Sequence, residues 1–283
     1  MTPFAVITID LNPNLFQVGA FLVTWHGIFS VLGILAAARL GAYLLEQDGV
    51  TSQQVYDMAV WMVVVGIIGA RLLYVWENYH QFTSQPIWKV VALNEGGISQ
   101  WGGIFGALLG GWIWCRRNRV PFLRVVDAAG PANAVGFMIG RIGDVINGEH
   151  HGTPTSLPWG VNYGNEHTLG QIGRVVHPEV AYEMALSLLL LVALLPLYRR
   201  MRARFPEGVT GLTWLALYAA GRFLLSYLRE DSLLFGLRQA QWAGLLMVLI
   251  AVVAIPWLLR TRRPWTPGEG AEPPPEPAEK AVA

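Results

Sequence analysis

Charged residues and cysteine are both scarce in this 283-residue chain. Asp, Glu, Lys and Arg together make up 14% of the sequence, whereas hydrophobic residues make up 53%. This balance excludes a typical soluble or disordered protein and indicates an integral membrane protein. The single cysteine, Cys115, excludes a disulfide framework within the chain. A formal net charge of +1 gives no reason to expect a nucleic-acid partner.

Internal repeats are also absent, which argues against a transporter built from inverted repeats. The chain instead has seven apolar runs that can cross a bilayer as helices, the form that satisfies backbone groups in lipid. These runs are Val18–Leu45, Tyr56–Val75, Gly102–Trp114, Val125–Ile142, Ala181–Leu197, Gly211–Leu228 and Trp242–Leu259. We therefore predict an all-α integral membrane protein with seven transmembrane helices, the third run being the shortest for a span.

Basic residues are missing from some of the segments between these runs. Met1–Gln17 contains no Lys or Arg, and Trp76–Gln100 contains only Lys89. Arginines gather instead after the third, fifth and seventh runs, at Arg116, Arg117, Arg119, Arg124, Arg199, Arg200, Arg202, Arg204, Arg260, Arg262 and Arg263. The positive-inside rule then places the N-terminus outside and the C-terminus in the cytoplasm, which agrees with an odd number of spans.

The same pattern predicts the domain organisation. Residues 1–263 form a seven-span membrane domain with an extracytoplasmic loop of about residues 150–176, which is long and polar enough to cap a site. Residues 264–283 are rich in Pro, Glu and Ala and are predicted to be a disordered cytoplasmic tail. The first run has features of a signal peptide, but its lack of a basic n-region and its length favour an uncleaved span.

One dense polar stretch, Gly140–Gly152 (GRIGDVINGEHHG), ends a membrane-length apolar run. Charged groups inside a bilayer cost roughly 2.5–3.5 kcal/mol each and tend to mark functional sites. Arg141 and Asp144 are three residues apart, so they share a helix face and can pair. Gly148 suits a left-handed helix cap, which would turn Glu149 toward the mouth of a cavity.

Other polar residues are predicted to lie on the same outer side of the membrane. Arg222 is in the outer half of the sixth run, Trp101 opens the third, and His26 lies about 12 Å into the first. A shared outer-leaflet cavity follows, in which Arg141 and Arg222 suit a phosphate because guanidinium groups donate in a planar fork. Arg71, which ends the second run, is expected to extend toward the interface.

The remaining conspicuous residues receive structural interpretations. His150 and His151 are expected to be solvated loop residues, and suitably spaced further zinc ligands are missing, so we predict no metal and no cofactor. Glu183 is expected to pair with an arginine. Cys115 lies across the membrane from the polar stretch without a nearby His or acid, and is expected to be a passive thiol.

Gly140–Glu149 (GRIGDVINGE) resembles the signature of bacterial prolipoprotein diacylglyceryl transferases. Shorter pieces resemble the family in order along nearly the whole chain: Trp25-His26-Gly27, Gly69-Ala70-Arg71, Gly102-Gly103, Asp127, Pro158-Trp159-Gly160-Val161, His177-Pro178, Tyr182-Glu183 and Gly221-Arg222-Phe223. The topology that the resemblance implies, with the N-terminus outside and the C-terminus inside, matches the one predicted from arginine placement.

The resemblance implies an enzyme of the bacterial cytoplasmic membrane whose cavity faces the outer leaflet. It would transfer the diacylglyceryl group of phosphatidylglycerol to the lipobox cysteine of a preprolipoprotein, releasing glycerol phosphate. Its partners would be phosphatidylglycerol, the preprolipoprotein signal peptide and membrane lipids. Such chemistry needs a thiolate, a base to make it and cations that stabilise the leaving phosphate. The resemblance assigns phospholipid binding to Arg141, Arg222 and Asn147, and a polar role to Glu149.

Four positions differ in residue type from the family pattern: His26 (tyrosine in the family), Trp101 (histidine), Asp144 (asparagine) and Ser226 (glutamate). Two accounts stay open. In a rewired enzyme, His26 supplies the imidazole and Asp144 orients it, so that His26, Asp144 and Glu149 form the catalytic set. Alternatively, the chain is a divergent paralogue with a changed acceptor, or a non-catalytic phospholipid-binding protein, since Asp144 competes with a phosphate for Arg141.

Overall fold

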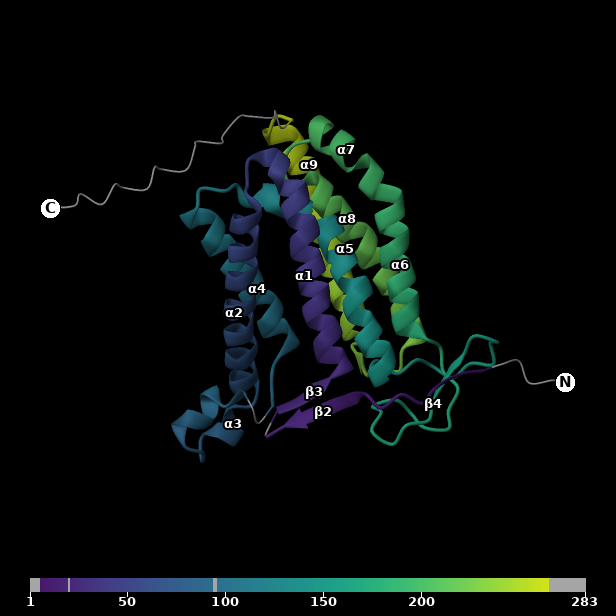
Figure 1. Cartoon of the computed structure of the whole chain (residues 1–283). Helices are drawn as coiled ribbons and strands as arrows, with labels where there is room; N and C mark the ends of the chain where they lie inside the picture. The colour runs from purple at the N-terminus through teal and green to yellow at the C-terminus, as the bar shows by residue number, and fades with distance from the viewer. Residues whose placement is uncertain (1–5, 20, 94–95, 265–283) are drawn as a thin grey trace.

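A computed structural model describes residues 6–19, 21–93 and 96–264, so the predicted tail lies, apart from Pro264, outside the described residues. Helices make up most of the described chain and run side by side (Figure 1). The long ones are α1 (Trp25–Leu45), α2 (Ser52–Glu77), α4 (Gln100–Arg117), α5 (Phe122–Asn147), α6 (Glu179–Leu194), α8 (Val209–Leu225) and α9 (Gln239–Thr261). Two shorter helices are α3 (Tyr79–Phe82) and α7 (Tyr198–Arg204).

Six helical segments of the described chain are long and apolar enough to cross a membrane: Trp25–Asp48, Ser52–Glu77, Phe122–Asn147, Glu179–Arg204, Val209–Leu228 and Gln239–Thr261. The prediction of a helical membrane protein is therefore confirmed. The helix outside this set is α4, because Gln100, several glycines and two arginines lower the apolar character of its 18 residues.

The first span begins later than its apolar run suggested. Strands β2 (Asn14–Val18) and β3 (Phe21–Thr24) form an antiparallel hairpin, and α1 begins only at Trp25. Thr24 caps this helix, since its side-chain oxygen accepts a hydrogen bond from the backbone N–H of Gly27 at 3.1 Å. An apolar run does not by itself distinguish strand from helix. His26 therefore lies in the first turn of α1, and the prediction that it is deep within the span was wrong.

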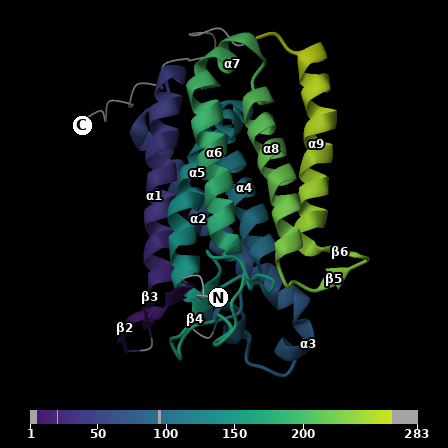
Figure 2. The same cartoon turned by 90° about the vertical axis from the view of Figure 1, so that its right-hand side faces the viewer.

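Glycines allow the helices to approach closely. Helix α1 packs against α5, α2 packs against α4, and α8 packs against α9, with α6 contacting both α5 and α8 (Figures 1 and 2). A Cβ atom added to Gly33 of α1 would lie 2.6 Å from the carbonyl oxygen of Gly136 in α5. A Cβ on Gly69 of α2 would lie 2.5 Å from the carbonyl oxygen of Gly102 in α4. Small residues at such crossings are typical of helix pairs in membranes.

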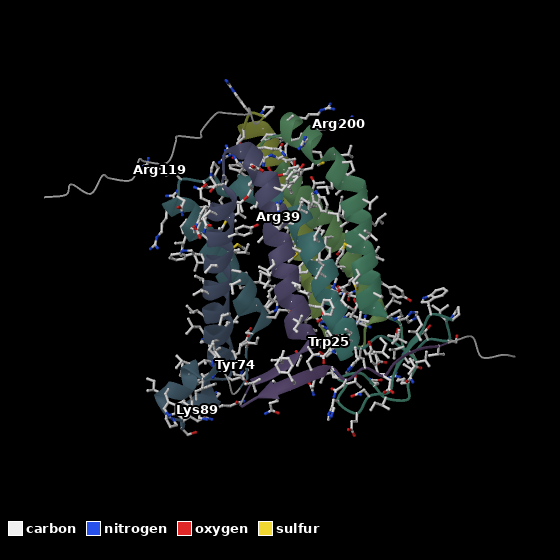
Figure 3. All side chains as sticks on the ribbon, viewed as in Figure 1. Trp25, Arg39, Tyr74, Lys89, Arg119 and Arg200 are labelled. Carbon is white, nitrogen blue, oxygen red and sulfur yellow. The ribbon has the colours of Figure 1, made fainter. Side chains whose placement is uncertain are left out.

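The two ends of the bundle differ in charge and structure. One end, which we call the arginine-rich end, carries residues 116–119, 199–204 and 260–263, and Figure 3 labels Arg119 and Arg200 there. At this end Arg202 is buried and binds Asp48 at 2.8 Å and Asp127 at 3.2 Å. The opposite end, near the labelled Trp25, carries the β2–β3 hairpin and the loop before α6.

The loop of residues 150–176 is ordered by backbone pairing with distant parts of the chain. Its strand β4 (Val161–Tyr163) pairs in parallel with β1 (Ile7–Ile9). The backbone N–H of Glu230 donates to the carbonyl oxygen of His151 at 2.9 Å, and the Arg174 guanidinium pairs with the Glu230 carboxylate at 2.6 Å. A second short hairpin, β5 (Leu233–Leu234) with β6 (Leu237–Arg238), follows. The loop is thereby held against the end of α8.

Arg71, which the sequence predicted to extend toward the interface, is buried within the protein. It is 6% exposed, and its guanidinium donates to four backbone carbonyl oxygens at 2.5–2.8 Å, those of Lys89, Val90, Gly96 and Gly97. A buried arginine needs such partners to offset the loss of its hydration. Arg71 therefore organises the segment between α3 and α4 and lies apart from the candidate site.

Candidate active site

A polar cavity of about 340 Å³ lies between α1 and α5 toward the end opposite the arginines. His26 lines it from the first turn of α1, and Arg141 and Asp144 line it from the last turns of α5. Its other polar lining residues are Ser30 of α1, Gln100 at the start of α4 and Asn133 midway along α5. Gly33 and Gly136, where α1 and α5 cross closely, are also part of the lining.

Asp144 is held between an imidazole and a guanidinium. The Nδ1 atom of His26 lies 2.6 Å from Oδ1 of Asp144, and Nη1 of Arg141 donates to Oδ2 at 2.6 Å. The predicted pairing of Arg141 with Asp144 is confirmed. A carboxylate only accepts, so we assign the His26 proton to Nδ1, which leaves Nε2 of the neutral ring as a proton acceptor. This arrangement orients a base by a buried acid.

Glu149 returns to the same site from beyond the end of α5. The helix ends at Asn147, and Gly148 adopts the predicted left-handed cap with φ of 77°. This turn places Oε1 of Glu149 3.9 Å from Nδ1 of His26 and 2.5 Å from the amide nitrogen of Asn147. Asp144 and Glu149 thus both lie near His26, because α5 and its cap pack against the start of α1.

The three residues of this set are also spaced like metal ligands. One ligand atom each from His26, Asp144 and Glu149 lies within 4.8 Å of the others. Arg141 already neutralises Asp144, however, and a positive guanidinium beside the carboxylate opposes a further cation. The absence of a metal stays a prediction.

A chain of buried ion pairs extends from Arg141 away from the cavity. Nη2 of Arg141 binds Oε2 of Glu183 at 2.8 Å, and the other oxygen of Glu183 pairs with Nε of Arg222. Arg222 in turn binds Glu179 at 2.8 Å, and the second oxygen of Glu179 is 3.3 Å from Arg229. The prediction that Glu183 pairs with an arginine is confirmed, and it pairs with both Arg141 and Arg222. Figure 2 shows α6, which carries Glu179 and Glu183, beside α8, which carries Arg222.

Arg222, a predicted phospholipid ligand, is not among the residues that line the polar cavity. It lies behind Glu183, and its Nη1 also lies 3.2 Å from the hydroxyl of Ser226. Ser226 is fully buried and donates back to the carbonyl oxygen of Arg222 at 2.8 Å. A direct contact of Arg222 with phosphate stays a prediction, whereas Arg141 reaches the cavity wall.

His150 is not the solvated loop residue that the sequence predicted. Its Nδ1 accepts a hydrogen bond from Nη2 of Arg229 at 2.9 Å, and its Nε2 lies 3.8 Å from Oδ2 of Asp144. Burial and the positive charge of Arg229 lower the pKa of His150 to about 4. The sequence missed it because Arg229 is 79 residues away. His151 is exposed, as expected, and its Nε2 bonds to the carbonyl oxygen of Leu169.

These contacts close a ring of seven side chains. In order they are Asp144, Arg141, Glu183, Arg222, Glu179, Arg229 and His150. Three arginines alternate with three acids, so their formal charges cancel, and His150 is the neutral member between Arg229 and Asp144. Opposite charges at these distances lower the cost of burying each of them.

The half-buried His150 predicts a loss of stability in acid. Its pKa is about 4 in the folded protein against 6.5 for a free histidine. As the pH falls, the unfolded chain takes up the proton before the folded protein does. The contribution of His150 to the free energy of unfolding is therefore complete above the free pKa and is lost as the pH falls toward the folded pKa, up to roughly 3 kcal/mol. We expect the Tm of the purified protein to fall over this range, and less so for His150→Asn. Parallel curves for the two proteins would contradict the assignment.

Trp101 does not line the cavity, although the sequence placed it there. Its ring stacks on Phe105 within α4, with centroids 6.0 Å apart, and the preceding Gln100 lines the cavity instead. Gln100 and Asn133 were both missed. The available signal was an amide side chain beside or within an apolar run, where it needs a hydrogen-bonding environment.

An apolar cavity of about 460 Å³ adjoins the polar one. It lies between the α1–α5 pair and the α2–α4 pair and shares Ile34, Ala37 and Asn133 with the polar cavity. At its far end it reaches Leu45 and Met58. The polar site therefore adjoins an apolar cavity across a wall of shared residues.

Comparisons with known proteins agree with this architecture. The sequence model of the prolipoprotein diacylglyceryl transferase family matches residues 13–257. A phosphatidylglycerol--prolipoprotein diacylglyceryl transferase of Gloeobacter violaceus is 38% identical over 88% of this chain and 93% of its own length. The enzyme of that name from Trichormus variabilis is 30% identical over 93% of this chain and 95% of its own length. A Clostridium perfringens enzyme, number 1 of that name, is 34% identical over 87% of this chain and 94% of its own. The chain belongs to the prolipoprotein diacylglyceryl transferase family.

Proposed function

We propose that the protein transfers the diacylglyceryl group of phosphatidylglycerol to the lipobox cysteine of a preprolipoprotein and releases glycerol phosphate. The printed names of its relatives give the donor and the prolipoprotein acceptor. One observation carries the proposal for this chain. A base, His26, and a cation, Arg141, share Asp144 at the wall of a polar cavity that adjoins an apolar one.

The two cavities suit the two parts of a phospholipid. The headgroup phosphate would lie in the polar cavity against Arg141, whose guanidinium donates to phosphate oxygens in a planar fork. The acyl chains would enter the apolar cavity past Ile34 and Ala37, which line both spaces. Gln100 and Asn133 offer amide groups for the hydroxyls of the glycerol headgroup.

The reaction needs the cysteine thiol as its thiolate, which is the nucleophile. His26 takes the thiol proton on Nε2, while Asp144 holds Nδ1–H and stabilises the imidazolium that forms. The thiolate then attacks the glyceryl carbon bonded to the phosphate oxygen. A carbon–sulfur bond forms, the carbon–oxygen bond breaks, and its electron pair leaves with the phosphate. Arg141 stabilises this developing charge, and the proton on His26 returns to solvent or product.

Glu149 and Asn147 act beside this pair. Glu149 lies 3.9 Å from His26, so it adds negative charge near the imidazolium, and Asn147 fixes the carboxylate through the 2.5 Å hydrogen bond. Arg222 acts on the phosphate indirectly. It shares Glu183 with Arg141 and so helps to set the position of that arginine. The catalytic set is thus His26, Asp144 and Glu149.

The membrane orientation is part of the proposal. We propose seven spans, with α4 as the third, the N-terminus outside and the C-terminus in the cytoplasm of a bacterium. The arginine-rich end would face the cytoplasm by the positive-inside rule. The polar cavity, at the opposite end, would then face the outer leaflet, where a secreted preprolipoprotein presents its signal peptide and lipobox.

A transfer assay on the purified protein tests the function. The protein would be reconstituted with phosphatidylglycerol and a lipobox peptide, and lipidated peptide and glycerol phosphate would both be measured. We expect the two products in equal amounts, and none when the peptide cysteine is replaced by serine. Binding of phosphatidylglycerol without product would instead support a phospholipid-binding protein or a paralogue with another acceptor. The proximity of Asp144 to Arg141, which competes with phosphate, is the observation that favours that alternative.

A further inference from the structure

Both terminal nitrogens of Arg141 bind a carboxylate in this structure. Its Nη1 is bonded to Asp144 and its Nη2 to Glu183, each at 2.8 Å or less. A phosphate that binds Nη1 or Nη2 in a bidentate contact therefore competes with one of the two carboxylates for that nitrogen. Glu183 keeps a second arginine, Arg222, on its other oxygen. Asp144 would lose the donor on Oδ2, the oxygen opposite the one that holds His26.

His150 lies where a replacement donor is needed. Its Nδ1 faces Arg229, which can only donate, so the ring proton must be on Nε2. This Nε2–H is 3.8 Å from Oδ2 of Asp144, about one ångström beyond hydrogen-bonding distance. His150 has a left-handed backbone with φ of 61°, which turns its ring back toward α5.

We propose that His150 is a positioning residue, which moves onto Oδ2 of Asp144 when Arg141 turns to the phosphate and so keeps the carboxylate aligned with His26. The inference rests on the proposed function, because it requires a phosphate ligand in the polar cavity. It assigns a role to a residue outside the family signature, and His150 acts only through Asp144.

A histidine fits this role for a physical reason. Arg229 and burial keep the ring neutral at physiological pH, so it donates a hydrogen bond without bringing a charge. In the free protein a charged donor at this position would compete with Arg141 for Asp144. After the phosphate binds, a neutral donor leaves the negative charge of Asp144 available to the imidazolium of His26.

Two variants separate positioning from a merely structural role. His150→Asn keeps an acceptor for Arg229 near the Nδ1 position and tolerates a left-handed backbone, but it lacks the donor that faces Asp144. His150→Gln places a donor near the Nε2 position and loses the acceptor for Arg229. We expect His150→Asn to lower kcat at least about tenfold with KM for phosphatidylglycerol within about twofold, and His150→Gln to retain most of the activity.

The reverse order, with the asparagine variant active and the glutamine variant slow, would show that His150 only holds Arg229 and would overturn the proposal. A double-mutant cycle checks the path through Asp144. In an Asp144→Asn background, His150→Asn should change kcat less than about twofold, because the carboxylate that it serves is gone. Additive effects would also overturn the proposal.

A spectroscopic measurement does not depend on turnover or on the acceptor. In protein labelled with nitrogen-15 histidine, the His150 signals are those that disappear in His150→Asn. Phosphatidylglycerol should move the Nε2–H signal downfield as the bond to Asp144 forms. If the lipid binds and this signal stays in place, the positioning role is wrong while the proposed function stands. If the lipid does not bind, both the positioning role of His150 and the proposed function are contradicted.

Discussion

Arg141→Ala should reduce diacylglyceryl transfer roughly 100- to 1000-fold, the effect expected when one donor to a developing anion is removed. Arg141 is the arginine that lines the polar cavity, and its two carboxylate partners fix it there. The fold should survive, because Asp144 keeps His26 and Glu183 keeps Arg222. Initial rates at saturating peptide and varied phosphatidylglycerol measure the effect.

The control for Arg141→Ala is Arg174→Ala. Arg174 also pairs with an acid, Glu230, but it is exposed on the outer loop and lies outside the cavity lining. It should transfer at close to the normal rate, which excludes a general effect of losing a positive charge. The transfer rate of Arg141→Lys should lie between those of Arg141→Ala and Arg174→Ala, since lysine keeps the charge and loses the planar fork. Transfer by Arg141→Ala within tenfold of normal would remove Arg141 as the phosphate ligand.

His26→Phe should reduce transfer about 100- to 10,000-fold, the usual contribution of a positioned base. Phenylalanine fills the ring space but cannot accept the thiol proton. Because Arg141 remains beside Asp144, KM for phosphatidylglycerol should change little, and the loss should fall on kcat. A peptide offered at high pH, where its thiol is already ionised, should regain part of the rate.

The matched control for this variant is His167→Phe, which removes an exposed loop histidine beside Glu166. It should behave as the unmodified protein in rate and Tm. A His26→Phe protein with normal turnover would remove His26 as the base. Glu149, whose carboxylate lies 3.9 Å from Nδ1 of His26, would then be the next candidate for the base.

Helix positions were predictable from the sequence because membrane spans leave a strong local signal. The last six apolar runs each coincide with a helix or its core, and the arginines between them gather at one end of the bundle. The first run, Val18–Leu45, misled because Phe21–Thr24 is apolar enough to continue a helix, yet it forms strand β3 of a hairpin. That hairpin forms through pairing between its strands, which composition does not reveal.

The candidate site was predictable where its contacts are local. Arg141 and Asp144 are three residues apart, and helix geometry alone brings them together. His26 reaches Asp144 across 118 residues, and resemblance to a family signature was needed to place both in one site. His150 and Arg71 were misjudged because their partners, Arg229 and the carbonyl groups near Gly97, depend on how loops return to the bundle.

The ring of ion pairs has a consequence for which anions the protein can recognise. A phosphate that binds Arg141 competes with Asp144 and Glu183 for the guanidinium, and a small water-soluble phosphate brings little additional binding energy to that competition. A diacyl lipid brings about 0.8 kcal/mol for each methylene that enters the apolar chamber. A few buried methylenes therefore offset a weakened contact. The hydrocarbon tails, which take no part in the chemistry, supply the binding free energy that lets the headgroup compete with Asp144 for Arg141.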